Sequence, residues 1–265
     1  MIVPNAMIVL KSAREIELMR AAGRLVCQVL DALERMITPG VTTAALDAVA
    51  SRLIQEAGAT ALFLGVKNAQ ARFPFPASIC ASVNDAVVHG VPSDRPLAAG
   101  DIVSVDCGVR YKGFCGDSAR TFAVGKVAPQ TQRLMDVTRA TLDLAIARMR
   151  PKVRWSVIAA EMQRMVEEAG FGVVTEFVGH GIGRDMHEEP KVPNYFDGGR
   201  DGSDFELVPG MTLAIEPMVT AGRPTVKFAD RDGWTIVTKD GSAAAHFEHT
   251  VAITRDGSDV LTDGR

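Results

Sequence analysis

The chain has few cysteines, no long apolar segment and almost no excess charge, and each scarcity narrows its class. Its four cysteines show no CxxC spacing, so the sequence predicts reduced thiols and neither a disulfide framework nor a zinc module. No apolar run approaches the ~18 residues of a membrane span. A net charge of −3 and a pI near 6.0 give no general attraction to nucleic acid or anionic membranes. We therefore expect a cytoplasmic protein without a signal peptide, membrane contact or direct recognition of nucleic acid.

The chain is long enough, at 265 residues with 47% hydrophobic content, to bury a full core. No linker rich in Pro, Gly or Ser divides it, which favours one catalytic domain over 1–265 with a short N-terminal extension, 1–11. Caps and breaks such as Ser12 and Gly58 mark the helix ends. They predict helices over 12–36, 43–57, 130–149 and 155–169. Apolar patterning predicts strands over 79–88, 101–124, 173–178, 211–219, 234–239 and 247–254.

A weak internal repeat relates the two halves, about 12–125 and 130–254. Leu18-Met19, Glu56-Ala57-Gly58 and Gly100 to Asp106 recur as Leu134-Met135, Glu168-Ala169-Gly170 and Gly210 to Glu216, at offsets of 116, 112 and 110. A glycine followed by an apolar strand and then a carboxylate occurs in both copies. The repeat predicts two pseudo-symmetric helix–helix–strand units that bring Asp106 and Glu216 together.

Two aspartates stand in a predicted hairpin, residues 101–124. If its loop is centred between Tyr111 and Lys112, paired positions sum to 223, and 106 plus 117 is 223. Asp106 and Asp117 would then oppose each other directly, where like charges destabilise a sheet. A bound cation would remove that repulsion. By strand alternation we expect the thiols of Cys107 and Cys115 to face away from the acids.

Further ligand-type residues occur in the second half. His180 is flanked by Gly179, Gly181 and Gly183, which allow close approach of the backbone to a ligand. Glu216 ends an apolar strand, where an unpaired carboxylate would be costly to bury. Glu248 lies in another strand-like segment, where an exposed carboxylate is an equally good interpretation of that residue alone.

Four carboxylates and one imidazole indicate a transition-metal site. The imidazole favours Mn, Fe, Co or Zn over Mg or Ca. Four acids exceed the need of one divalent ion, so we expect two ions bridged by carboxylates, about 3.5–4 Å apart. Such a centre lowers the pKa of a bridging water, and the chemistry that it predicts is hydrolysis.

Six segments resemble type I methionine aminopeptidase over about residues 12 to 262. They are NDAVVHGVP (84–92), GDIVSVDCG (100–108), GDSARTFAVG (116–125), GHGIGRDMHEEP (179–190), PGMTLAIEPMV (209–219) and AAHFEHTVAIT (244–254). The resemblance implies an α+β pita-bread fold, with pseudo-two-fold halves around a central curved antiparallel sheet. It also implies removal of N-terminal methionine from nascent proteins and peptides with a small second residue.

The resemblance implies roles for individual residues. The metal ligands would be Asp106, Asp117, His180, Glu216 and Glu248, holding two divalent ions (Co, Mn, Fe or Zn). A metal-bridging water or hydroxide would attack the scissile carbonyl, with Glu216 as proton acceptor. His187 would stabilise the oxyanion, and His89 would contact the scissile amide. The partners would be nascent peptide N-termini, with room for a transient contact with the ribosome, and the enzyme would be a monomer.

The substrate pocket departs from the family pattern. The segment 63–80 is longer than the common form by about six residues, and phenylalanines stand near the positions of family tyrosines. The expected pocket remains apolar, with soft walls suited to a thioether. Its predicted residues are Phe63, Phe73, Phe75, Cys80, Met186 and Trp234, beside His89 and His187. Ordinary core packing is an equal alternative for Phe73 and Phe75.

Two other functions remain open. A proline-directed aminopeptidase of the same fold would share the metal ligands, although the IEPM motif and the lack of a preceding domain oppose it. An inactive pita-bread binding protein is less favoured, because all five ligands are present. His246 stands where the family often has glutamine, and the sequence does not decide between an outer hydrogen-bond donor and a plain substitution.

Overall fold

A computed structural model describes residues 7–196, 198, 204–229 and 232–265. Its helices are α1 (Ala13–Glu34), α2 (Thr43–Glu56), α3 (Pro129–Arg148) and α4 (Trp155–Glu168). The strands of the first half are β1 (Thr60–Ala61), β2 (Cys80–Val83), β3 (Ala86–Val88), β4 (Ile102–Tyr111) and β5 (Phe114–Ala123). Those of the second half are β6 (Gly172–Val173), β7 (Gly179–Gly181), β8 (Glu188–Val192), β9 (Thr212–Ile215), β10 (Met218–Thr220), β11 (Val226–Phe228), β12 (Ile236–Thr238), β13 (Ala244–His246), β14 (His249–Ile253) and β15 (Ser258–Val260).

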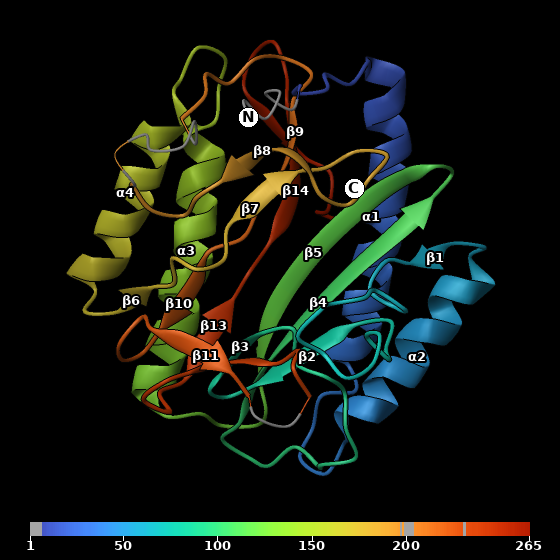
Figure 1. Cartoon of the computed structure of the whole chain (residues 1–265), viewed down its shortest axis with the longest axis vertical. Helices are drawn as coiled ribbons and strands as arrows, with labels where there is room; N and C mark the ends of the chain where they lie inside the picture. Colours follow the sequence, from blue (N-terminus) through green and yellow to red (C-terminus); the bar gives the residue numbers. More distant parts are fainter. Residues whose placement is uncertain (1–6, 197, 199–203, 230–231) are drawn as a thin grey trace.

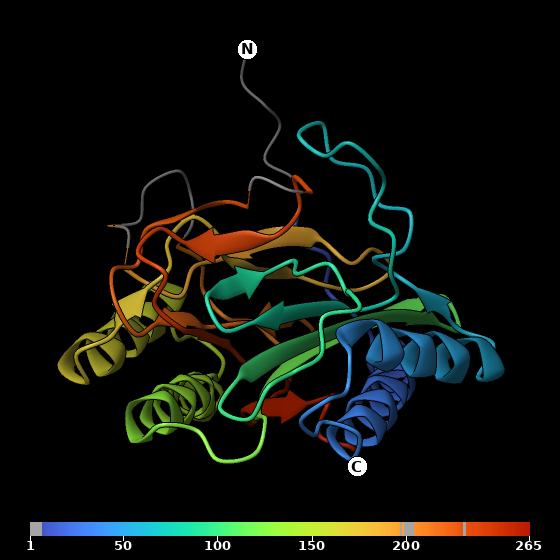
Figure 2. The ribbon, with the colours of Figure 1, turned by 90° about the horizontal axis from the view of Figure 1, so that it is seen from below.

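The four helices form one layer and the strands another (Figures 1 and 2). Every strand pairing in the described part of the chain is antiparallel, in sheets ordered β1-β4-β2 with β5 on β4, β13-β10-β6, β11-β12-β3 and β15-β14-β9-β7-β8. Separate helices and antiparallel sheets confirm the predicted α+β class. Among the described residues, no helix has the length and apolarity needed to cross a membrane.

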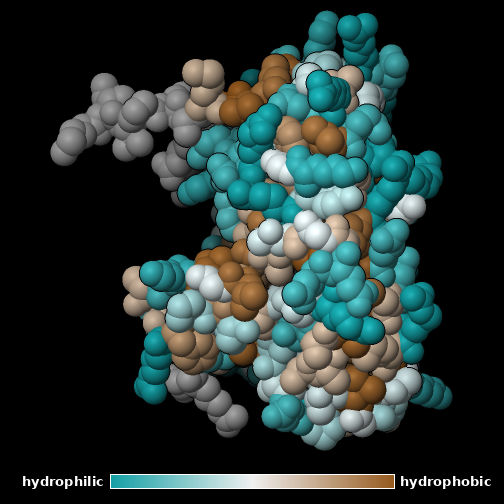
Figure 3. Space-filling model, turned by 90° about the vertical axis from the view of Figure 1, so that its right-hand side faces the viewer, coloured by the Kyte–Doolittle hydropathy of each residue, from teal (hydrophilic) through white to brown (hydrophobic). Residues whose placement is uncertain are grey.

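The helix starts follow the predicted caps. Ser12 accepts a hydrogen bond from the Glu15 amide, and the Glu15 carboxylate accepts one from the Ser12 amide, which completes the capping box. Thr42 caps α2 by accepting from the Ala45 amide at 3.1 Å. Hydrophilic side chains cover much of the side that carries α1 and α2, interrupted by smaller hydrophobic areas (Figure 3).

The two helix pairs end alike. Ala57 and Ala169 close α2 and α4 with the same backbone angles, φ −75° and ψ −6°. Gly58 and Gly170 follow with φ of 68° and 80°, a conformation that glycine adopts without a Cβ penalty. These matches are what a repeat predicts, and the division into halves 12–125 and 130–254 stays our interpretation. Of the extension 1–11, only residues 7–11 lie within the described part.

The β4–β5 hairpin has a different register from the predicted one. Tyr111 pairs with Phe114, so paired positions sum to 225 and Asp106 lies opposite Ala119. The turn is the two-residue Lys112-Gly113, with φ of 51° and 83°, as in a type I′ turn. The predicted direct pair is therefore wrong: Asp106 and Asp117 are diagonal neighbours on the same face.

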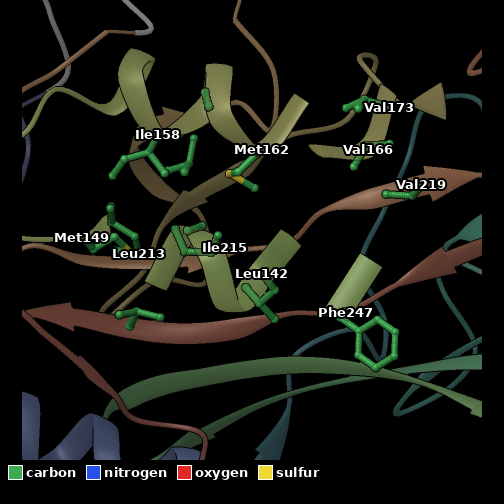
Figure 4. Packing of buried hydrophobic residues seen from close by; sticks show 14 of the residues in the cluster. Leu142, Met149, Ile158, Met162, Val166, Val173, Leu213, Ile215, Val219 and Phe247 are labelled. Carbon is green, nitrogen blue, oxygen red and sulfur yellow. The ribbon is translucent and has the colours of Figure 1, made fainter. Parts of the chain in front are cut away.

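Strand alternation separates the core from the opposite face. Val103, Val105 and Cys107 of β4 pack in the core under α1 and α2, so Asp106 points to the other face of the sheet. In the second half, Leu213 and Ile215 of β9 lie among side chains of α3 and α4 (Figure 4).

Several predicted strands are shorter or broken. Segment 173–178 is wrong as a strand beyond Val173, and β14 begins at His249 instead of 247. The prediction missed β1, β7, β8, β11, β13 and β15. These are segments of two to five residues whose extended form depends on pairing with other strands. Glu248 lies in the break between β13 and β14.

Candidate metal centre and active site

The five predicted ligands line one cavity of about 190 Å³. Asp106 and Asp117 come from the β4–β5 hairpin, His180 from β7, Glu216 from the end of β9 and Glu248 from the β13–β14 break. The complete lining is Phe63, Val66, Phe75, Cys80, His89, Asp106, Asp117, His180, Met186, His187, Glu216, Trp234 and Glu248. A wider hollow of about 720 Å³ also touches His180 and His187 but contains none of the four acids.

The donor atoms are close enough to share a cation. One ligand atom from each of Asp117, His180 and Glu248 lies within 4.8 Å of the others. His180 Nε2 lies 3.7 Å from Glu216 Oε1. His180 Nδ1 lies 2.8 Å from the Gly181 carbonyl oxygen, so Nδ1 carries the proton and Nε2 keeps its lone pair for a metal.

The acids fit a metal because they lack other partners. Asp106 Oδ1, Asp117 Oδ1 and Glu248 Oε1 are buried and have no hydrogen-bond partner within the described ranges. Buried polar atoms are nearly always satisfied, so three such oxygens in one cavity point to a cation as the missing partner.

Burial and mutual repulsion make ionisation of these acids difficult without a cation. Burial raises the pKa of Asp117 to about 8, aided by the charge of Glu216. Burial also raises the pKa of Glu216 to about 7, against the opposite effect of His180. The pKa values of Asp106 and Glu248 are raised well above their usual range by burial and by the neighbouring carboxylates. A divalent ion would reverse these shifts.

Two threonines tie the halves together at this site. Thr250 Oγ1 accepts from the Asp117 amide at 3.0 Å and donates to the Asp117 carbonyl at 2.8 Å. Thr121 Oγ1 makes the same two bonds to His246, at 2.9 and 2.8 Å. The Glu248 amide donates to the Ala119 carbonyl at 2.9 Å. The hairpin of the first half therefore fixes the backbone of the second half beside the acids.

Two predicted catalytic histidines stand at the edge of the acids. His89 has a left-handed backbone, φ 57°, which is uncommon for a residue with a side chain and clusters at functional sites. Burial lowers the pKa of His89 to about 4 and also lowers that of His187, so both rings are neutral near pH 7. The His187 ring centroid lies 4.4 Å from that of His180.

An apolar cluster also lines the cavity. Phe75 makes edge-to-face contacts with Phe63 and Trp234, at centroid distances of 6.4 and 5.3 Å. Cys80 and Met186 pack in the same cluster, and all five line the cavity.

Phe73 does not line the cavity, and the residue is 40% exposed. It lies in the β1–β2 connection, part of which projects beyond the strands in Figure 2. Its carbonyl accepts a hydrogen bond from Trp234 Nε1 at 2.9 Å, so the backbone of Phe73 supports the pocket while its side chain does not contact it.

Sequence reasoning missed one residue of the cavity, left the role of His246 open and misjudged the orientation of Cys115. Val66 lines the cavity mouth, and no motif could reveal it because it lies in the unusual 63–80 segment. His246 Nε2 lies 3.6 Å from Glu216 Oε2. Cys115 shares strand parity with Asp117 and was wrongly expected to face away from the acids. Its thiol donates to the Arg184 carbonyl at 3.4 Å.

Comparisons with known proteins agree on one family. The model of metallopeptidase family M24 matches residues 17–255. The methionine aminopeptidase of Clostridium perfringens is 46% identical over 256 residues, 97% of this chain and 99% of that protein. The crystal structure of methionine aminopeptidase from Rickettsia prowazekii has a TM-score of 0.90 at 38% identity, covering 97% of this chain and 100% of the other.

A structure with lower sequence identity shares the same fold. Prolidase from Pyrococcus furiosus has a TM-score of 0.73 at 21% identity, over 97% of this chain and 66% of its own, and shares the fold alone. These neighbours confirm the predicted pita-bread fold. The chain belongs to metallopeptidase family M24 and, within it, to the type I methionine aminopeptidases.

Proposed function

We propose that this chain is a metal-dependent aminopeptidase that removes N-terminal methionine from peptides and proteins with a small second residue. The observation that carries the proposal is the cavity itself. Buried carboxylates, three of which have an oxygen without a hydrogen-bond partner among the described residues, line one cavity together with the His180 imidazole and an apolar cluster. This is the arrangement that hydrolysis next to an apolar side chain requires.

Asp106, Asp117, His180, Glu216 and Glu248 would hold two divalent ions, with Co, Mn, Fe and Zn all compatible with the donor set. Bound ions would supply Lewis acidity and a water of lowered pKa near the scissile carbonyl. Asp117 and Glu248 are suited to hold such an ion, because both are buried and each has an oxygen without a partner among the residues described.

The protein's own groups would handle protons and the developing charge. Glu216 would accept the proton from the attacking water at a carboxylate oxygen. His187 and His89, neutral because burial lowers their pKa values, can each donate one N–H, to the carbonyl oxygen and near the scissile amide respectively. The strained backbone of His89 fits a residue held in one orientation.

The apolar cluster would receive the methionine side chain. Cys80 and Met186 offer polarizable sulfur, and Phe63, Phe75 and Trp234 offer ring faces and edges to a thioether.

We further propose that the enzyme works in the cytoplasm as a monomer on nascent chain N-termini, with at most a transient ribosome contact. Four free, buried cysteines suit a reducing compartment.

A peptide panel tests the activity. Metal-loaded enzyme should release methionine from Met-Ala-Ser and leave Ala-Pro-Ser and Leu-Ala-Ser intact. Release of alanine from Ala-Pro-Ser would move the protein to the proline-directed branch. Absence of any release would favour the inactive binding protein.

Ligand variants test the residues. Asp106→Asn and Glu216→Gln should each lose turnover together with bound metal. Retained turnover with metal still bound would contradict the ligand assignment.

A further inference from the structure

His246 is a buried, chemistry-bearing side chain at the site to which the proposed mechanism gives no role. It is 2% exposed, and its Nε2 has no hydrogen-bond partner in the described part of the chain. Glu216 Oε2 lies 3.6 Å from this nitrogen, a distance too long for a hydrogen bond but with the correct polarity. The other oxygen, Glu216 Oε1, faces His180 Nε2 at 3.7 Å. The Glu216 carboxylate therefore lies between two imidazoles.

Hydrogen bonds from two neighbouring strands hold the backbone of His246. Thr121 Oγ1 donates to the His246 carbonyl and accepts from its amide, and Ser104 Oγ lies 2.8 Å from the same hydroxyl. Thr121 has a single proton, which goes to His246, so Ser104 must donate to Thr121. His246 also pairs with Met218 in the β10–β13 ladder. Bonding from two sheets therefore fixes the backbone from which the His246 ring projects.

The contacts of His246 match those of Asp117 in the first half of the chain. Thr121 holds His246 as Thr250 holds Asp117, and both pairs are related by an offset of 129, since 246 minus 117 and 250 minus 121 are each 129. His246 therefore occupies, in the second half, the place that the first half gives to a proposed metal ligand. His246 does not itself line the cavity, and it reaches the site through Glu216, which does.

His246 is nevertheless not one of the grouped metal-ligand candidates. The ligand atoms that lie within 4.8 Å of one another belong to Asp117, His180 and Glu248. The contact of His246 with the site is to Glu216 Oε2. The backbone of Glu216 is held by Asn194, whose Nδ2 donates to the Glu216 carbonyl at 3.1 Å. This bond holds the backbone and does not itself set which carboxylate oxygen faces His180.

We propose that His246 is a positioning residue whose Nε2–H donates to Glu216 Oε2 and so directs Oε1 toward the metal centre. The proposal rests on the metal centre proposed above. An outer hydrogen bond of this kind fixes which oxygen a ligand carboxylate presents, and its loss typically lowers metal affinity by about 10–100-fold.

The test uses metal-stripped full-length protein titrated with Co²⁺, followed by calorimetry and by visible absorption of the bound ion. His246→Leu removes the donor and should weaken Co²⁺ binding at least about tenfold. His246→Gln, whose amide N–H can replace the donor, should stay within about threefold of wild type, a rescue that a purely structural role would not produce. His249→Leu is the matched control, because His249 is a buried imidazole that bonds Thr262 and should leave Co²⁺ affinity unchanged.

Circular dichroism and melting of the metal-free variants check folding, and His246→Ala replaces the leucine variant if that variant unfolds. Unchanged Co²⁺ affinity in a folded His246→Leu would overturn the proposal. So would a His246→Gln variant as weak as His246→Leu, because a replacement N–H donor would then fail to restore Co²⁺ affinity. A wild-type protein that binds no Co²⁺ would instead refute the metal centre, and with it the proposed function.

Discussion

The metal-free protein should lose stability as the pH rises from 6.5 to 8. Asp106, Asp117, Glu216 and Glu248 are buried together, and burial raises the pKa of each in the folded chain. The folded protein then keeps protons that the unfolded chain releases. Rising pH favours the unfolded chain until it passes the folded pKa of each acid.

Buried histidines act in the opposite sense, which sets the lower limit of the window. Burial lowers the pKa of His89, His246 and His249 to about 4, so protonation of the unfolded chain favours unfolding at low pH. The unfolding free energy therefore gains from these residues as the pH rises toward 6.5, and little above it. Above pH 8, the buried thiols would add to the loss. Between these limits the carboxyls dominate.

The magnitude follows from Asp117, whose folded pKa of about 8 lies far above the unfolded value of 3.8. Each pH unit costs up to about 1.4 kcal/mol per such carboxyl, so Asp117 alone lowers the unfolding free energy by about 2 kcal/mol between pH 6.5 and 8. That loss lowers Tm by roughly 4–8 °C in a protein of this size. Asp106 and Glu248 add to the loss with the same sign.

Calorimetric melting of metal-stripped protein at pH 6.5, 7 and 8 measures the effect. Metal-loaded protein should show no such fall, because the cation keeps the carboxylates ionised in the folded chain. Asp117→Asn should reduce the fall by about 2 kcal/mol. Asp240→Asn, at an exposed carboxyl whose pKa is already lowered to about 2, should leave it unchanged. A Tm of the metal-free protein that stays constant or rises over this window would refute the reasoning.

Three further changes probe the supports of the site. Gly108→Ala would place a Cβ 3.1 Å from Asp117 Oδ1. Metal affinity measured by calorimetry should therefore fall roughly tenfold. An affinity equal to that of the wild type would show that this carboxylate can move freely. Trp234→Phe removes the hydrogen bond to the Phe73 carbonyl. If the substrate loses about 1 kcal/mol of binding free energy, KM for Met-Ala-Ser should rise about fivefold at unchanged kcat. A fall in kcat alone would contradict this. Thr250→Val leaves the buried Asp117 amide unsatisfied and should cost about 1–3 kcal/mol in urea unfolding, and an unchanged midpoint would argue against the clamp.

Local signals in the sequence were enough to predict the helices and the set of acids. Ser12 with Glu15, and glycines such as Gly58 and Gly170, mark helix ends by chemistry that operates within a few residues. Carboxylates that end apolar strands, such as Glu216, indicate a ligand because burial without a partner is costly. The structure places the five ligand candidates around one cavity, and their individual roles remain predictions.

The hairpin register could not be predicted in the same way. It depends on Lys112 adopting a left-handed backbone, φ 51°, which an ordinary lysine rarely does. Moving the turn by one residue changes the pairing sum from 223 to 225, and so turns a direct Asp106–Asp117 pair into a diagonal one.

The pocket shows a second limit. Phe73 and Phe75 have the same chemistry and lie two residues apart, yet only Phe75 meets Trp234 inside the cavity. Contacts with a segment about 160 residues away decide between them. The mouth residue Val66 depends on the same loop, in which Phe75 donates a backbone hydrogen bond to the Val66 carbonyl at 2.8 Å.

The most direct test of the central claim measures bound metal and methionine release in the same sample. Metal-stripped enzyme is titrated with Mn²⁺, Fe²⁺ or Co²⁺, and free methionine from Met-Ala-Ser is followed beside the metal content. We predict no release without metal and turnover that rises with bound metal in the wild type. Glu248→Gln should remain inactive at the same added metal. Full turnover in the stripped enzyme, or metal binding without any methionine release, would contradict the account.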